Sequence, residues 1–352
     1  MARVTAVRRL LASLLAVTLP LLAAPAAGAA TTPPAGETYT NPLLPSGPDP
    51  WVVQRDGVYY YMNTEGDRIA LRKTRDLARL AEAPPITVWT PPHDGPGSFA
   101  LWAPELHWLA GKWYLYYTAS VRGHDDDAHR RIYVLENGAA DPTTGTWVSK
   151  GALATERPGI DGTVFALKDQ LYFVYSPYVG DHSDLVISRM ANPWTLTGPQ
   201  VDIAHPTHTW EMQGGRKILE GPEFLQGPSG KLFLTYSGSA CWSDDYALGL
   251  LSAAAGADPM DPAAWHKSPR PVFAKSVKHG VYATGHNGFF QAPDGQDWII
   301  YHANSGPGMK CTAKRAPHIQ PFRWRKDGTP DFGVPAKEGV PLPAPATKAA
   351  TP

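Results

Sequence analysis

The chain has 352 residues, and its 32 lysines and arginines balance its 32 aspartates and glutamates, so the formal net charge is zero. Without a surplus of basic side chains to neutralise phosphates, the chain is not expected to bind nucleic acid. Its 12 tryptophans, 15 tyrosines, 33 glycines and 36 prolines favour strands and turns over helices. These numbers predict an all-β protein.

The first thirty residues have the pattern of a secretion signal peptide. Arg3, Arg8 and Arg9 precede an apolar stretch over residues 10–24, which a run of small residues follows. The stretch is short for a membrane span and is interrupted by Pro20. We therefore expect a secreted, extracellular protein that has no membrane contact once residues 1–30 are removed, and the arginine pair leaves the export route open.

One hairpin-like pattern recurs five times along the chain, in segments that open at Asp49, Ala103, Asp161, Glu220 and His286. Each segment has a short apolar run, a polar turn and a second run rich in Tyr, Phe and Trp, as a β-hairpin would. The segments begin roughly 55 to 65 residues apart, which leaves room for two further strands in each. This recurrence predicts five similar four-stranded units.

A five-bladed β-propeller over residues 36–335 accounts for the repeat. A β-sandwich or jelly roll would also contain many short strands, but it would not require one pattern to recur five times. The Pro/Ala-rich segment over residues 336–352 has too little apolar surface to fold alone, so we expect it to be a disordered tail.

Three of the residues that open the repeats are carboxylic acids: Asp49, Asp161 and Glu220. The first strand of each propeller blade lines the central channel, so residues at equivalent positions converge at one end of that channel. Asp-Pro and Asp-Gly dipeptides are common in turns, but Asp161 precedes its apolar run instead of connecting the two runs of a hairpin. Three acids that converge on one pocket predict a functional site.

Six short motifs, spread from about Tyr39 to Trp324, carry a resemblance to a known family. In chain order they are Asn41-Pro42 through Gly47-Pro48-Asp49-Pro50-Trp51, Trp102-Ala103-Pro104-Glu105, Asp161-Gly162-Thr163-Val164-Phe165, Trp210-Glu211, Glu220-Gly221-Pro222-Glu223 and Gly285-His286-Asn287. With these motifs the chain resembles glycoside hydrolase family 43, and within it the exo-acting α-1,5-L-arabinofuranosidases.

The resemblance implies a role for each acid: Asp49 as general base, Glu220 as general acid, and Asp161 as the carboxylate that orients the acid and raises its pKa. It also implies an inverting hydrolase that releases L-arabinose from arabinan or arabino-oligosaccharides. Glu223 is the rival candidate for the acid. It lies three residues beyond Glu220, and in a regular strand the two would face opposite sides.

Several other activities remain open. A β-xylosidase or an arabinofuranosidase that debranches arabinoxylan would use the same three acids, because pocket shape selects the sugar. An endo-arabinanase would need an open groove, which the loops around Trp210 and Trp242 would decide. A propeller that binds glycans without cutting them would have no need of the three acids.

Flat aromatic side chains and a few polar groups are expected to bind the sugar, and we predict Trp51, Trp102 and Phe165 for the aromatic platform. Arg315 matches an arginine that reaches the active site in many members of the family. His286 is expected near the channel axis.

No cofactor is expected to be required. The resemblance implies that a calcium or other cation can lie in the central channel, beside His286. The acidic loop over residues 124–129 is expected to be a solvated loop and not a metal site. Cys241 and Cys311 are the two cysteines, and the sequence leaves open whether they form a disulfide. We expect a monomer.

Overall fold

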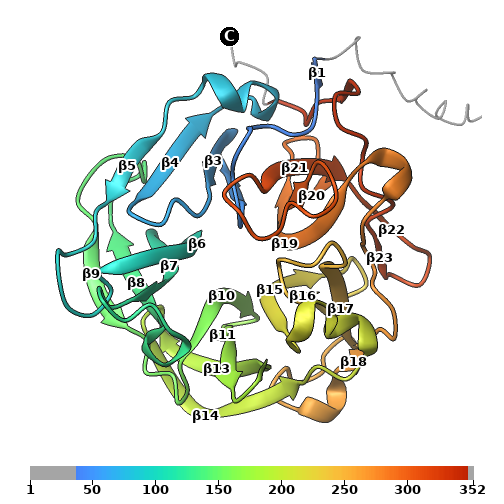
Figure 1. Ribbon diagram of the computed structural model, residues 1–352. Coiled ribbons are helices and arrows are strands. Elements are labelled where there is room, and N and C mark those ends of the chain that lie inside the picture. Colours follow the sequence, from blue (N-terminus) through green and yellow to red (C-terminus); the bar gives the residue numbers. More distant parts are fainter. Residues whose placement is uncertain (1–36, 348–352) are drawn as a thin grey trace, which may run out of the picture. The chain divides into compact units, whose positions relative to one another are not determined.

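The computed structural model describes residues 37–347. Within this range, five β-sheets stand in a ring, one after another along the chain (Figure 1). The predicted five-bladed β-propeller is therefore confirmed. The predicted signal peptide, residues 1–30, lies outside the described residues.

Neighbouring strands within each blade are antiparallel, and they follow one another along the chain. The first two blades consist of β2 (Trp51–Arg55), β3 (Val58–Met62), β4 (Ile69–Thr74) and β5 (Ile86–Trp89), and of β6 (Phe99–Leu109), β7 (Lys112–Ser120), β8 (Arg131–Asn137) and β9 (Val148–Ala152). The third and fourth consist of β10 (Gly159–Leu167), β11 (Gln170–Val179), β13 (Leu185–Asn192) and β14 (Thr195–Ala204), with β12 (His182–Ser183) beside β11, and of β15 (Leu219–Gln226), β16 (Leu232–Gly238), β17 (Ala247–Ala253) and β18 (His266–Lys267).

The fifth blade differs from the prediction of four strands. Among the described residues it contains β19 (Tyr282–Gln291), β20 (Asp297–Asn304) and β21 (Ala316–Pro321), so it has three. The chain that follows forms a separate hairpin of β22 (Arg323–Trp324) and β23 (Pro330–Asp331) instead of a fourth strand.

The aromatic second strands form the cores between blades, because side chains alternate between the two faces of a strand. In β7, Trp113 packs toward the first blade and Tyr116 packs toward the third. Both side chains are fully buried, and Trp298 in β20 is nearly so. These three aromatic side chains belong to the packing cores between blades. Burial of both faces of the second strand stabilises its position and that of the inner strand paired with it.

Segments near the two ends of the described range, residues 37–347, pair with each other where the first and fifth blades meet. β1 (Thr38–Tyr39) pairs with β24 (Leu342–Pro343), and Leu342 packs against the core between the first and fifth blades. The backbone oxygen of Ala346 accepts a hydrogen bond from Tyr59. The structure corrects the expectation of a disordered tail for residues 336–347, because partners supplied by the propeller replace the apolar surface that the segment lacks.

Short 3-10 helices lie in the connections between strands. They are η1 (Leu77–Glu82), η2 (Asp127–His129), η3 (Thr209–Glu211), η4 (Gln213–Gly215), η5 (Pro262–Ala264) and η6 (Val277–His279). Within residues 37–347, none of the helices has the length and apolar character that crossing a membrane requires.

Candidate active site

The inner strands share a local distortion that shapes one end of the channel. β6, β10, β15 and β19 each shift register over two consecutive residues, as at a β-bulge. The first residue of each distortion, and Asp49 in the first blade, has a positive φ. The angles are 53° for Asp49, 44° for Ala103, 57° for Asp161, 53° for Gly221 and 48° for His286.

This pattern corrects the register that the sequence suggested for the fourth blade. The residue equivalent to Asp161 is Gly221, so Glu220 stands one position earlier, level with Trp102 and Ile160. The bulge turns the strand between them, and Glu220 still enters the same pocket as Asp161.

The backbone amide at each bulge donates a hydrogen bond to a side chain. The donor and acceptor pairs are Asp49 to His302 Nδ1 (3.1 Å), Ala103 to Thr64 Oγ1 (2.7 Å), Asp161 to Thr118 Oγ1 (3.0 Å), Gly221 to Asp161 Oδ2 (3.0 Å) and His286 to Ser237 Oγ (2.7 Å). In the third blade, Ser176 occupies the position that Thr118 and Ser237 have in theirs. Its buried hydroxyl has no hydrogen-bond partner among the described residues, because the Asp161 carboxylate accepts from Gly221 instead.

A pocket of about 400 Å³ lies at this end of the inner strands. Its lining comprises Asp49, Thr64, Trp102, Asp127, Ile160, Asp161, Tyr178, Ser183, Arg216, Ile218, Glu220, Cys241, Trp242, His286, Cys311 and Arg315. Six of the eight side chains predicted from the sequence are therefore together: Asp49, Trp102, Asp161, Glu220, His286 and Arg315.

Asp49 is held as an anion. Arg315 lies 2.9 Å from its Oδ1, and Thr64 donates to its Oδ2 at 2.7 Å. Burial alone would raise the pKa of Asp49, but Arg315, His286 and His302 outweigh burial and hold that pKa well below its ordinary value. The Asp49 carboxylate is consequently available to accept a proton at neutral pH.

Glu220 has the opposite electrostatic environment. Burial and the neighbouring Asp161 raise the pKa of Glu220 to about 7, against the opposing effect of His286 and of the Tyr246 hydroxyl, which donates to Glu220 Oε1 at 2.7 Å. Burial likewise raises the pKa of Asp161 to about 6, although His286 and the Gly221 amide lower it. Glu220 can therefore carry a proton at pH values where Asp49 is ionised.

His286 stands among the acids, with Nδ1 at 3.5 Å from Asp49 Oδ1. Burial lowers the pKa of His286, but Asp49, Asp161 and Glu220 raise it more, so the net shift is upward. Ligand atoms of Asp161, Glu220 and His286 lie within 4.8 Å of one another, close enough to face a single ion. A cation held by these three would ionise Glu220 and remove its proton, so the donor set does not fit both a resident cation and an acid at Glu220. A cation elsewhere in the channel stays a prediction.

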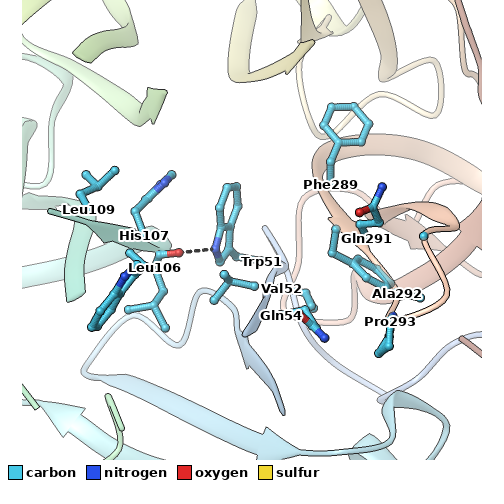
Figure 2. Close-up of a pocket in the computed structure, with 14 residues that line it drawn as sticks. Trp51, Val52, Gln54, Leu106, His107, Leu109, Phe289, Gln291, Ala292 and Pro293 are labelled. Atoms are coloured by element: carbon cyan, nitrogen blue, oxygen red, sulfur yellow. Dashed lines mark hydrogen bonds between the residues drawn. The ribbon is translucent and has the colours of Figure 1, made fainter. Parts of the chain in front are cut away.

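Trp51 and Phe165, two of the predicted sugar platforms, lie elsewhere. Trp51 follows the bend after Asp49 and lines a second cavity, of about 600 Å³, at the other end of the inner strands, where its indole donates to the Leu106 oxygen at 3.0 Å (Figure 2). Phe165 is buried and stacks on Phe224, with ring centroids 3.8 Å apart. The sequence prediction was wrong for both, because it assumed a regular strand beside each acid.

Glu223 does not line the pocket. The distortion between Glu220 and Glu223 places Glu223 deeper, where it is 5% exposed. Its burial speaks against the rival assignment as the acid. The sequence analysis placed Glu220 and Glu223 on opposite faces of a regular strand. In the structure, a bulge between the two residues separates their side chains instead.

Loops complete the rim of the pocket with residues that the sequence did not single out as part of the site. Asp127, in the acidic loop between β7 and β8 of the second blade, forms an ion pair at 3.0 Å with Arg216, which precedes β15 of the fourth blade. Cys241 and Cys311 form a disulfide that joins the fourth blade to the fifth. The cysteine pair was the one sequence signal that could have brought two of these loops together.

Trp102 has a polar partner at the pocket wall. The guanidinium carbon of Arg130 lies 3.3 Å from the centre of the Trp102 ring. Arg130 is buried and donates to the backbone oxygen of Ala100 at 3.1 Å. The indole is thereby fixed in orientation beside the acids.

Comparison with known proteins identifies the family of the chain. Residues 39–330 match the model of glycosyl hydrolases family 43. The chain is 41% identical over 349 residues to an extracellular exo-α-(1→5)-L-arabinofuranosidase of Streptomyces avermitilis. This alignment covers 95% of this chain and 71% of that protein. The chain is also 41% identical to a protein of the same name from Streptomyces chartreusis, over 84% of this chain and 91% of that one. Among solved structures, the α-L-arabinofuranosidase from Lactobacillus brevis superposes with a TM-score of 0.80 at 35% identity, covering 86% of this chain and 98% of that chain.

Proposed function

The chain belongs to glycosyl hydrolases family 43, and from that premise we propose that this glycoside hydrolase is a secreted exo-α-1,5-L-arabinofuranosidase that inverts the anomeric centre. The observation that carries the proposal is the presence of two oppositely tuned carboxyl groups in one pocket, Asp49 and Glu220. The named relatives supply the sugar and the exo mode of action.

In the proposed reaction Glu220 donates its proton to the glycosidic oxygen as the bond to the anomeric carbon breaks. Asp49 takes a proton from a water molecule whose oxygen attacks that carbon from the opposite face. The leaving sugar departs with the proton from Glu220, and the first product is β-L-arabinose. Asp49 ends protonated and Glu220 ionised, and exchange with solvent restores both before the next turnover.

Three side chains prepare these two acids. Arg315 keeps Asp49 ionised until water attacks. Asp161 keeps a proton on Glu220, since a second negative charge beside an acid favours its neutral form. The positive charge favoured on His286 lies among all three carboxyls and limits their mutual repulsion.

The rim supports action at chain ends. The Asp127–Arg216 pair and the Cys241–Cys311 disulfide connect loops of different blades around the pocket, and Trp242 stands 42% exposed beside them. A volume of about 400 Å³ suits one or two furanose rings. An endo-acting enzyme would need an open groove in place of these connections.

Sugar contacts are proposed for Trp102 and for polar groups of the wall. The Trp102 ring offers an apolar face, and Arg315 and His286 offer donors for hydroxyl groups. We further propose that residues 1–30 direct secretion, that arabinan or arabino-oligosaccharides are the substrate and that the protein acts as a monomer.

The test is the product pattern from debranched α-1,5-arabinan, followed by chromatography over time. Free arabinose as the sole early product supports the exo assignment. Early oligomers would indicate endo action, and cleavage of xylosides alone would refute the substrate. Nuclear magnetic resonance of the first product distinguishes inversion, which gives the β-anomer, from retention.

A further inference from the structure

A cluster of aspartate and histidine side chains lies on the third blade, outside the substrate pocket. Asp184 precedes β13, Asp202 lies in β14 and His205 follows β14. Because Leu185 pairs with Ala204, the two strands bring these side chains to the same end of the sheet (Figure 1). Their potential ligand atoms lie within 4.8 Å of one another, so one ion can contact all three.

Asp184 is the buried member of the cluster. It is 1% exposed, and its Oδ1 has no hydrogen-bond partner among the described residues. His205 Nδ1 lies 3.0 Å from the other oxygen, Oδ2, and His182 Nε2 lies 3.4 Å from Oδ1. An anion removed from water is costly unless an opposite charge or hydrogen bonds compensate it. The buried carboxylate therefore favours a cation at the cluster.

The charges around the cluster leave a negative surplus. Arg157 forms an ion pair with Asp202, at 2.5 Å from Oδ1, but its other terminal nitrogen is 4.0 Å from Asp184 Oδ2, too far for a hydrogen bond. Lys267 also attracts Asp184, from a greater distance, while it pairs with Glu211 at 3.0 Å. One adjacent guanidinium thus faces two carboxylates, which leaves one negative charge for a cation to balance.

The types of ligand favour zinc over calcium. Zn²⁺ binds imidazole nitrogen together with carboxylate oxygen, whereas Ca²⁺ takes six to eight oxygen ligands. Tetrahedral bonds of about 2.0 Å place neighbouring ligand atoms about 3.3 Å apart. The 3.0 Å between His205 Nδ1 and Asp184 Oδ2 is close to that spacing. A small movement of the exposed His205 side chain would open the tetrahedral distance.

We propose that Asp184, Asp202 and His205 bind one Zn²⁺ ion, with water in the fourth position. Asp202 can keep Arg157 on one carboxylate oxygen and bind the ion with the other. His182, on the far oxygen of Asp184, orients that carboxylate as histidine–carboxylate pairs do around other metal sites. The site is separate from the catalytic acids and does not depend on the proposed function.

The ion stabilises a segment that supports the substrate pocket. Ser183 directly precedes Asp184 and lines the pocket. Its hydroxyl donates to the Leu219 oxygen at 2.9 Å and accepts from the Leu219 amide at 3.2 Å. Leu219 directly precedes Glu220. A cation that fixes Asp184 thus holds the backbone before Glu220 in place without contacting the substrate.

The experiment measures zinc binding by calorimetry, on the full chain without a histidine tag and after removal of metals with a chelator. Zinc chloride alone is the probe, in the presence of excess calcium. Wild type should bind one Zn²⁺ per chain, and its melting temperature should rise by about 3 °C or more at saturating zinc. His205→Ala and Asp202→Asn should each weaken zinc binding by about tenfold or more. The side chain of His205 is 59% exposed, so His205→Ala should fold.

The chain offers a matched control in the acidic loop, where His124, Asp126 and His129 form another group with metal-ligand spacing. His129→Ala should leave the affinity for zinc unchanged. X-ray absorption of the zinc-bound wild type should show one imidazole among oxygen ligands, whereas the acidic loop would supply two imidazoles.

The absence of zinc binding in wild type would overturn the proposal. So would an affinity that is unchanged in His205→Ala, because the ion would then lie in the acidic loop or among the catalytic acids. Neither calorimetry nor the melting temperature depends on turnover. A protein that binds zinc through His205 but releases no arabinose would refute the proposed function and leave this site standing.

Discussion

A guanidinium nitrogen of Arg315 lies 2.9 Å from Oδ1 of Asp49, although the two residues are 266 positions apart in the sequence. The contact links the first blade to the loop before the last strand of the fifth. It places a fixed positive charge against the carboxylate that must stay ionised to accept a proton from water.

Replacing Arg315 by Gln should raise the pKa of Asp49, which Arg315, His286 and His302 hold low. Activity requires ionised Asp49 and is lost as the pH falls through its pKa, so the acidic limb of kcat/KM should move upward by about one pH unit or more. A pH–rate profile measures the shift. Arg325→Gln, at an exposed ion pair with Asp331, should leave the limb in place.

An acidic limb that did not move in Arg315→Gln would mean that Arg315 does not set the charge of Asp49.

Gly221 should tolerate no side chain. Its φ is 53°, its amide donates to Asp161 at 3.0 Å, and an added Cβ would lie 3.3 Å from the His286 ring. Gly221→Ala should lower the free energy of unfolding by about 1 to 2 kcal/mol and kcat by about tenfold or more, because the bulge, Asp161 and His286 move together. Denaturant unfolding and steady-state kinetics measure the two effects.

The matched control is Gly256→Ala, which has a φ of 79° and open space around its Cβ. It should cost similar backbone energy and leave kcat intact. Equal losses of kcat in both variants would refute a specific role for Gly221.

Tyr246 donates to Glu220 Oε1 at 2.7 Å and thereby stabilises the ionised acid. Tyr246→Phe should raise the pKa of Glu220 above its value of about 7, so the alkaline limb of the pH–rate profile moves to higher pH. The expected shift is several tenths of a pH unit. Tyr39→Phe, which removes a hydroxyl bonded to the Ile319 oxygen, should not move that limb.

A downward shift of the alkaline limb in Tyr246→Phe would show that the hydroxyl favours the protonated acid instead.

Much of this site follows from the sequence, because a propeller repeats one unit. The recurrence of the hairpin pattern placed Asp49, Asp161 and His286 at equivalent blade positions, and the positive φ at each of them bears this out. The same reasoning misplaced Glu220 by one position and put Trp51 at the wrong end of the channel. A bulge changes the face of the strand on which the side chains after the acid lie, and the periodicity of the sequence does not show where a bulge occurs.

The repeat pattern did not predict the residues that contact the acids and the rim from distant parts of the sequence. Tyr246 and His302 meet the acids from a loop and a second strand, and Arg216 reaches Asp127 across blades. Such contacts depend on how loops fold over the blades, which hydrophobic periodicity does not encode.

The disulfide should stabilise both fold and rim. Its closed loop spans 70 residues, and replacing Cys241 and Cys311 by Ser should lower the free energy of unfolding by about 2 to 5 kcal/mol. Because both cysteines line the pocket, KM for arabino-oligosaccharides should also rise. Denaturant titration with and without reductant gives the first quantity, and kinetics at a temperature where the variant is folded give the second.

An unchanged KM in the folded serine variant would limit the disulfide to a role in stability.

The central claim, that Glu220 is the acid and Asp49 the base, is tested most directly by changing the leaving group. Glu220→Ala and Asp49→Ala should be assayed on arabino-oligosaccharides and on an aryl α-L-arabinofuranoside whose leaving group needs no protonation. Glu220→Ala should lose nearly all activity on the oligosaccharide and keep much of it on the aryl substrate, whereas Asp49→Ala should lose both. Equal losses on the two substrates in Glu220→Ala, or a retained activity in Asp49→Ala, would contradict the assignment.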